Sequence, residues 1–163
     1  MIELLVNMGV PKQYAGDVWL LLLFFVASIV LILIVRKRNL GAMLVAVYVA
    51  YAIVTKSFFS FLQEPGIRLL YFIGVLFAVF QLVKRFFKMG IGGKKVIMWS
   101  KILLVAFSIV GLLGSIVMDW FSKEAVSEFF SPLSLQLFRA DQVQVAWMVV
   151  PLVLIFILVY RKM

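Results

Sequence analysis

Residues capable of acid–base or nucleophilic chemistry are few in this sequence. The chain has no Cys and no His, which removes thiol chemistry, imidazole catalysis and nearly all zinc, copper and haem sites. The densest acidic group is Asp119, Glu124 and Glu128, which follows a long apolar run. An enzyme would need these carboxylates to converge, but only Glu124 and Glu128 are spaced for one helical face. Solvation at an interface explains them more simply, so we predict no catalytic residue, no metal and no cofactor.

A glycine-rich stretch, MGIGGKK, is the other candidate for chemistry, because a turn rich in Gly can cradle a phosphate. No strand is expected before Gly90, and no Lys-Ser or Lys-Thr pair closes the loop. Both features are needed in a phosphate-binding loop. We therefore predict no nucleotide site here and interpret the glycines as a tight turn.

The composition indicates that lipid is the solvent of this chain. Of its 163 residues, 66% are hydrophobic, against about 45–50% in soluble domains. The net charge is +9, from 16 Lys and Arg and 7 Asp and Glu. We predict an all-α integral membrane protein whose positive charge meets anionic lipid head groups, with no nucleic acid as partner.

Five charge-free apolar runs predict a bundle of five transmembrane helices. A helix needs about 17–25 residues to cross the hydrocarbon core, and flanking Lys and Arg extend the shorter runs by reaching the interface. We predict one membrane domain, residues 1–163, without a cleaved signal peptide, because the N-terminus lacks a basic segment. The predicted spans are about residues 18–35, 39–55, 68–84, 97–118 and 142–160.

Basic residues concentrate in alternate loops. Residues 36–38, the loop after the third span and the C-terminal tail carry most of the Lys and Arg and none of the seven acidic residues. The positive-inside rule places these segments in the cytoplasm. This predicts an outside N-terminus and an inside C-terminus, in a bacterial cytoplasmic membrane, with the RKR triplet as a tight cytoplasmic turn. The basic residues that set the topology, or that also bind lipid, are Arg36, Lys37, Arg38, Lys84, Arg85, Lys88, Lys94 and Lys95.

Residues 119–141 form the longest segment predicted to lie outside the bilayer, on the extracytoplasmic side. Apolar residues recur along it at helical spacing, interrupted at Pro132. This predicts short amphipathic helices on the interface. Asp141 and Gln144 are spaced as a capping box for the last span. The segment is interpreted either as a packed connector or as a docking surface. The candidate docking residues are Phe121, Phe129, Phe130, Leu133 and Leu137.

Small residues repeat every four positions on three of the predicted spans. Such stripes let helix backbones approach closely, which is a main source of packing in lipid. They are interpreted as packing within one subunit or, alternatively, as the face of a homo-oligomer. Pro151 should kink the last span and free a carbonyl that needs a partner on another helix. The small residues are Ala42, Ala46, Ala50, Gly74, Ala78, Gly111 and Ser115.

Three stretches of the sequence together resemble a known family. They are VRKRNLGAMLVAVYVAYAIV, GIRLLYFIGVLFAVFQLVKRF and VGLLGSIVMDWFSKEAVSEFFSPLS. Their layout over roughly residues 18–138 resembles the colicin V production protein family, which are small bacterial inner-membrane proteins. The first turn here is RKRN instead of an Arg-Gly-type turn, and the span at 142–160 is an addition to the family's plan. The resemblance implies a role in toxin export, envelope homeostasis or stress survival, and it implies no reaction and no site residues.

The charge-free runs lack the acidic or basic residues that transporters and proton relays usually keep within their spans. The leading hypothesis is therefore a non-enzymatic multi-pass membrane protein. As the resemblance implies, it would support toxin or protein export or envelope assembly through partner binding. Its expected partners are further copies of the chain or other membrane proteins. The alternative hypothesis is a small homo-oligomeric membrane channel or transporter.

Overall fold

The computed structural model describes residues 12–57, 64–86, 95–122, 136–138 and 140–160. Within these ranges the regular structure is helical, and they contain no strand. This confirms the all-α prediction for the described part of the chain. The elements, in order, are α2 (Lys12–Val35), the short 3-10 helix η1 (Lys37–Asn39), α3 (Leu40–Lys56), α4 (Pro65–Val83), α5 (Lys95–Trp120) and α8 (Asp141–Tyr160).

Three of these helices are long and apolar enough to cross a membrane. The three segments are Asp17–Val35, Pro65–Val83 and Met98–Trp120, and they lie in α2, α4 and α5. The apolar parts of α3 and α8, Leu40–Lys56 and Gln142–Ile157, are shorter. The chain is therefore a helical protein with three candidate membrane-spanning helices.

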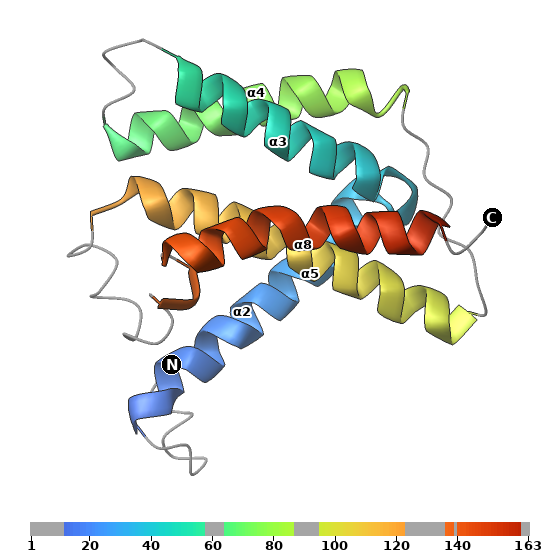
Figure 1. The fold of residues 1–163 in the computed structure, drawn as a ribbon, viewed down its shortest axis with the longest axis horizontal. Helices are drawn as coiled ribbons and strands as arrows, with labels where there is room; N and C mark the ends of the chain where they lie inside the picture. Colours follow the sequence, from blue (N-terminus) through green and yellow to red (C-terminus); the bar gives the residue numbers. More distant parts are fainter. Residues whose placement is uncertain (1–11, 58–63, 87–94, 123–135, 139, 161–163) are drawn as a thin grey trace.

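Helix α5 occupies the centre of the bundle. It packs against α2 and α8 along its length and against α3 over a shorter stretch, whereas α4 packs mainly on α3 (Figure 1). Two of the most buried side chains of the core, Ile102 and Ile109, come from α5. The outer surfaces of α2, α4 and α8 expose many large apolar side chains. A surface of this kind is stable in lipid, where exposed apolar groups carry no hydration cost.

The turn between α2 and α3 is short, as predicted, but the two helices diverge from it. Helix α2 ends at Val35, and the backbone N–H of Arg36 still donates to the Ile32 carbonyl oxygen at 3.0 Å. The chain then turns through η1 into α3. The two helices contact each other little beyond the turn, because α5 packs against both of them (Figure 1). The RKRN stretch is thus the apex of a splayed pair of helices.

Arg36 has a backbone conformation that favours glycine, with φ 59° and ψ 140°. A non-glycine residue in such a region costs about 1–3 kcal/mol. We expect Arg36→Gly to raise the free energy of unfolding by about 1 kcal/mol, since the relieved strain exceeds the added backbone entropy of Gly. Denaturant unfolding in detergent micelles measures this. Arg36→Ala is the control, because it removes the same charge and keeps the strain. An equal change in both variants would contradict the explanation.

Consecutive helices have their ends at alternate sides of the bundle. The ends of α2 and α4 and the beginnings of α3 and α5 lie at one side, to the right in Figure 1. The beginnings of α2, α4 and α8 and the ends of α3 and α5 lie at the other side. We call the first side the basic end, since it carries the described residues 36–38, 84–85 and Lys95. The acidic residues of the described ranges are near the opposite side, and they are Asp17, Glu64, Asp119 and Asp141.

Two local predictions concern the backbone of the last helix, and the structure tests the first of them. The Gln144 backbone N–H donates to the Ala140 carbonyl oxygen at 2.9 Å, which is the first hydrogen bond of α8. The residue that accepts this bond is the N-cap, so the predicted capping box, with Asp141 as the cap, was wrong by one position. The prediction that the carbonyl freed by Pro151 has a partner on another helix stays a prediction. The Tyr48 hydroxyl of α3 donates to the Met148 carbonyl oxygen, next to the Trp147 carbonyl that Pro151 leaves without its helical donor.

Candidate functional site

The polar side chains buried in the described part of the bundle are satisfied within it. They are three serines. Ser28 Oγ donates to the Phe24 carbonyl at 2.6 Å, and Ser108 Oγ donates to the Val105 carbonyl at 2.8 Å. Ser115 Oγ donates to the Phe138 carbonyl at 3.0 Å. No group of three or more acidic side chains that could hold a metal occurs in the described ranges. The described interior therefore offers neither a charged centre nor a continuous polar path.

Four aromatic side chains from different elements meet near the side of the bundle opposite the basic end. We call Phe24, Phe107, Phe138 and Trp147 the aromatic cluster. The rings of Phe138 and Trp147 stack, with their centroids 5.5 Å apart and an angle of 5° between their planes. The ring centroid of Phe24 lies 4.8 Å from that of Phe138. Trp147 Nε1 also donates to the Leu137 carbonyl oxygen at 2.9 Å. The short helical turn 136–138 is therefore held against α2, α5 and α8.

The aromatic cluster changes the interpretation of the predicted docking surface. Phe138 is buried, although the helical spacing did not single it out, and Leu137 is 46% exposed. Phe121 is half-buried and packs against the buried group of Leu20, Phe24, Met118 and Phe138. Phe129, Phe130 and Leu133 lie outside the described residues. No local sequence signal marks Phe138, because its ring partners Phe24 and Trp147 belong to other helices.

The small residues predicted to pack divide into two groups. Ala42, Ala46 and Ala50 are fully buried on α3, and Gly111 and Ser115 are buried on α5. A Cβ on Gly111 would lie 2.0 Å from Trp147 Cζ3, so this glycine gives room for the indole ring. These five residues are buried within the subunit.

Gly74 and Ala78 of α4 do not pack within the subunit. Both are exposed, and a Cβ on Gly74 would have no atom within 4 Å. Leu70 and Phe77 beside them are exposed as well. We call Leu70, Gly74, Phe77 and Ala78 the α4 outer face. The predicted small-residue stripe of α4 therefore lies on the surface.

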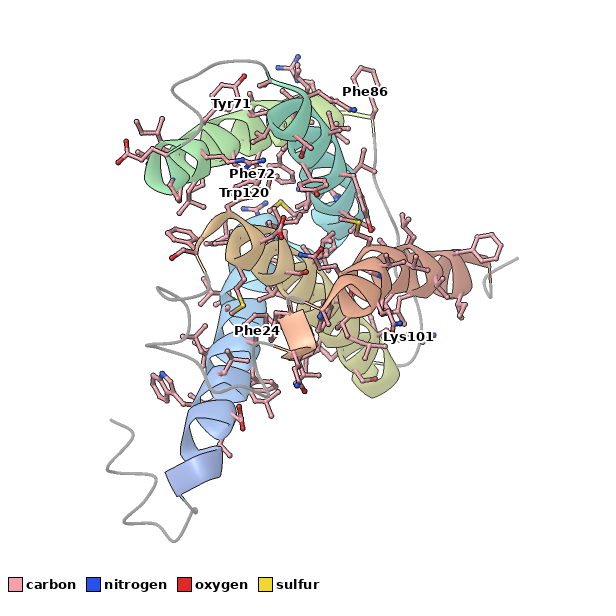
Figure 2. The ribbon with its side chains drawn as sticks, turned by 60° about the vertical axis from the view of Figure 1, so that its left-hand side comes forward. Phe24, Tyr71, Phe72, Phe86, Lys101 and Trp120 are labelled. Carbon is pink, nitrogen blue, oxygen red and sulfur yellow. The ribbon has the colours of Figure 1, made fainter. Side chains whose placement is uncertain are left out.

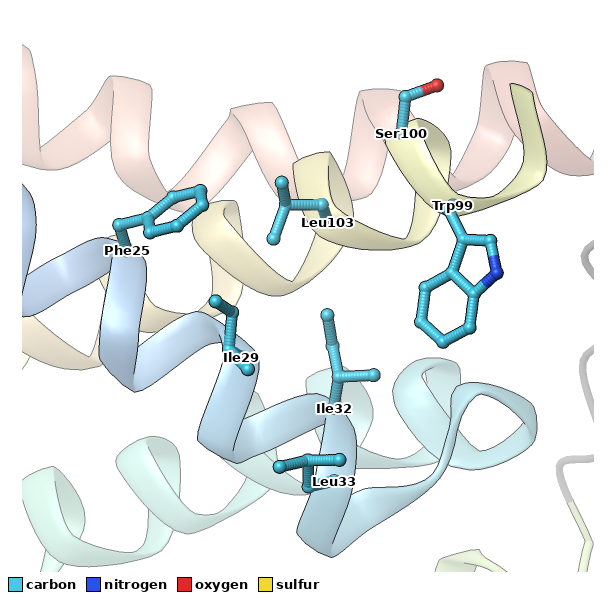
Figure 3. A pocket seen from close by; sticks show the side chains of 7 residues that line it. All are labelled: Phe25, Ile29, Ile32, Leu33, Trp99, Ser100 and Leu103. Atoms are coloured by element: carbon cyan, nitrogen blue, oxygen red, sulfur yellow. The ribbon is translucent and has the colours of Figure 1, made fainter. Parts of the chain in front are cut away.

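An apolar groove runs between α2 and α5 near the basic end of the bundle. Its volume is about 310 Å³ and the side chains from the two helices face each other across it (Figure 3). Ser100 is the one polar residue in its wall. The lining residues are Phe25, Ile29, Ile32 and Leu33 of α2 and Trp99, Ser100 and Leu103 of α5.

The predicted basic residues gather at the basic end, as far as the structure describes them. Arg36, Arg38 and Arg85 are exposed, and Lys84 is half-exposed. Lys37 and Lys95 belong to η1 and α5, and Lys88 and Lys94 lie outside the described residues. At the opposite side Arg68 lies over the Trp120 ring, with its Cζ 4.8 Å from the ring centroid. This contact joins the beginning of α4 to the end of α5.

Comparison with known proteins adds no relative to this description. No family model matches the chain, and no curated protein or solved structure matches it.

Proposed function

We propose that this chain is a five-span protein of a bacterial cytoplasmic membrane, with its N-terminus outside and its C-terminus in the cytoplasm. It supports protein or toxin export or envelope assembly by binding partners, and it catalyses no reaction. The export role is what the resemblance to the colicin V production family implies. The observation that carries partner binding is the α4 outer face, which is apolar, exposed and lined by small residues.

The α4 outer face suits a second transmembrane helix. Phe72 is the buried residue of α4, and the remainder of this helix is exposed or half-exposed. Gly74 and Ala78 lie one helical turn apart, so a partner helix can bring its backbone close to α4. Helices associate in lipid mainly through such close packing and hydrogen bonds, because lipid chains are as apolar as the helices. This supports a helix of a second copy or of another membrane protein as the partner.

The alternative, a channel or transporter, receives less support from the described interior. A path for ions or polar solutes needs polar or charged side chains along it. The buried polar side chains within the described ranges are Ser28, Ser108 and Ser115, and each donates to a carbonyl of the same chain. A pore would therefore have to form between copies of the chain.

The five-span topology is supported by the alternating helix ends and by the segregation of charge. Helix α3 has 17 residues, which span about 26 Å at 1.5 Å per residue. This is close to the hydrocarbon thickness of about 30 Å, and the Lys56 side chain at its end can reach the interface. A reporter fused after Met163 should be active in the cytoplasm, and one fused before Met1 should be active outside. An extracytoplasmic C-terminal reporter would refute the five-span arrangement.

The partner-binding proposal makes a direct prediction for Ala78→Leu. The larger side chain keeps the backbone of a partner helix away from α4. Overpacking of this kind costs about 1–3 kcal/mol, so the affinity for the partner should fall about tenfold. The measurement is a pull-down from membranes through a C-terminal tag, with the masses of the complexes read by native mass spectrometry. The intensity of the complex, relative to the free chain, gives the effect.

The matched control is Ala52→Leu, the same substitution at an exposed position of α3. It should leave the complex intact, and both variants should keep the unfolding free energy of the parent. The mass of the bound protein distinguishes a second copy from a different partner. Equal recovery of the complex with Ala78→Leu and with the parent chain would show that α4 does not bind the partner.

A further inference from the structure

The groove between α2 and α5 has the properties of a lipid site. We propose that it binds an acyl chain of an anionic phospholipid, whose phosphate is held by the positive charge of Arg36 and Arg38. This inference needs membrane insertion and does not depend on the proposed export role. It is carried by the apolar wall of the groove, by the charge at its end and by the conformation of Arg36.

The wall of the groove fits one hydrocarbon chain. Phe25, Ile29 and Leu33 lie along one side of α2, over nine residues or about 12 Å of helix. Trp99 and Leu103 of α5 form the opposite wall (Figure 3). The exposed apolar surface of α2 surrounds the groove, so it opens toward lipid. A flexible acyl chain is the ligand that the bilayer supplies at this depth.

Both walls of the groove continue into basic residues. On α2, Leu33 is three residues before Arg36, and the Arg36 backbone N–H donates to the carbonyl oxygen of the lining residue Ile32. On α5, Trp99 lies one helical turn after Lys95, where the helix begins. The acidic residues of the described ranges are near the opposite side of the bundle. Charge complementarity at this end therefore selects a lipid with an anionic head group.

The backbone of Arg36 adds an independent observation. Its φ of 59° is one at which Gly would be unstrained. The arginine at this position is exposed and directly follows the end of α2, and guanidinium groups bind phosphate oxygens through paired hydrogen bonds. Within the proposal, the binding of the lipid phosphate is the role of this strained arginine.

The test measures lipid retained by the purified full-length protein. The protein is exchanged into detergent, offered a phosphatidylglycerol or a phosphatidylcholine with the same acyl chains, and examined by native mass spectrometry. We expect the parent chain to retain the phosphatidylglycerol in preference to the phosphatidylcholine. Arg36→Gly should lower this retention about fivefold, the effect of one basic residue at a membrane surface. Because this variant relieves strain, its loss of lipid cannot be attributed to unfolding. Arg85→Gly, at the end of α4, is the charge control and should retain the lipid.

The groove itself is tested by Ile29→Trp, which places an indole between its walls. Val30→Trp is the matched control, since Val30 is exposed to a similar extent, 45% against 40%, and does not line the groove. Ile29→Trp should lose phosphatidylglycerol, and Val30→Trp should retain it. Equal retention of both lipids by the parent chain, or equal effects within either pair of variants, would overturn the proposal. A parent chain that retains phosphatidylglycerol but carries no bound partner would refute the proposed function alone.

Discussion

Replacing Phe72 by Ala should cost this protein about 3 kcal/mol of unfolding free energy. Phe72 is 2% exposed, and its ring meets that of Trp120 edge to face, with centroids 5.2 Å apart (Figure 2). Truncating a buried Phe costs about 3–5 kcal/mol through lost contacts and the cavity left behind. The lower end applies here, because lipid and not water surrounds the unfolded helices.

The effect of Phe72→Ala should be specific to the attachment of α4. Helix α4 packs mainly on α3, so the Phe72–Trp120 pair is a principal link between α4 and α5. The unfolding free energy is measured by titration with a denaturing detergent. Phe77→Ala is the matched control, because Phe77 lies on the same helix and is 63% exposed. A cost above about 1 kcal/mol for Phe77→Ala, or below that for Phe72→Ala, would contradict this view of the packing.

Gly111→Ala should destabilise the bundle by about 2 kcal/mol, although Ala is the better helix former. The new Cβ would lie 2.0–2.5 Å from three atoms of the Trp147 ring, so the indole must move. The ring is held by its stacking on Phe138 and by its hydrogen bond to the Leu137 carbonyl. Overpacking costs about 1–3 kcal/mol, and the loss of the stacked pair and the hydrogen bond adds about 1–2 kcal/mol. The higher helix propensity of Ala stabilises α5 by about 1 kcal/mol and offsets part of this cost.

Gly74→Ala provides the comparison for Gly111→Ala. A Cβ at Gly74 would have nothing within 4 Å, so the propensity gain is unopposed and the free energy of unfolding should rise by up to about 1 kcal/mol. The same detergent titration measures both variants. The explanation fails if the two glycines respond with the same sign. It also fails if Gly111→Ala costs as much in a Trp147→Leu background as in the parent chain, since the smaller side chain removes the clash.

The described bundle consists of two layers of helices. Helices α2, α5 and α8 share the aromatic cluster, and α5 packs along both of its neighbours. Helices α3 and α4 form the second layer. This layer contacts α5 through a short stretch of α3 and through the Phe72–Trp120 pair. The proposed partner surface lies on α4, whereas the proposed lipid groove lies in the other layer. Variants of the two surfaces should therefore act independently.

The sequence by itself determined the class of structure and much of the element order. Long apolar runs without charge must form helices in lipid, since every backbone N–H and C=O has to be bonded within its own segment. The described helices accordingly lie close to the predicted spans, with α3 at Leu40–Lys56 against 39–55 and α4 at Pro65–Val83 against 68–84. Pro65 takes the first helical position of α4, where its missing N–H has no cost.

Only the tertiary structure decided which small residues are covered. Gly74 and Gly111 have the same local pattern, yet Gly111 receives the Trp147 ring and Gly74 faces outward. The role of Phe138 and the groove between α2 and α5 were likewise absent from the sequence pattern. In soluble proteins polarity distinguishes the covered face of a helix from the exposed one. In lipid both faces are apolar, so periodicity carries little information about which helix packs where, and the contacts between distant segments decide it.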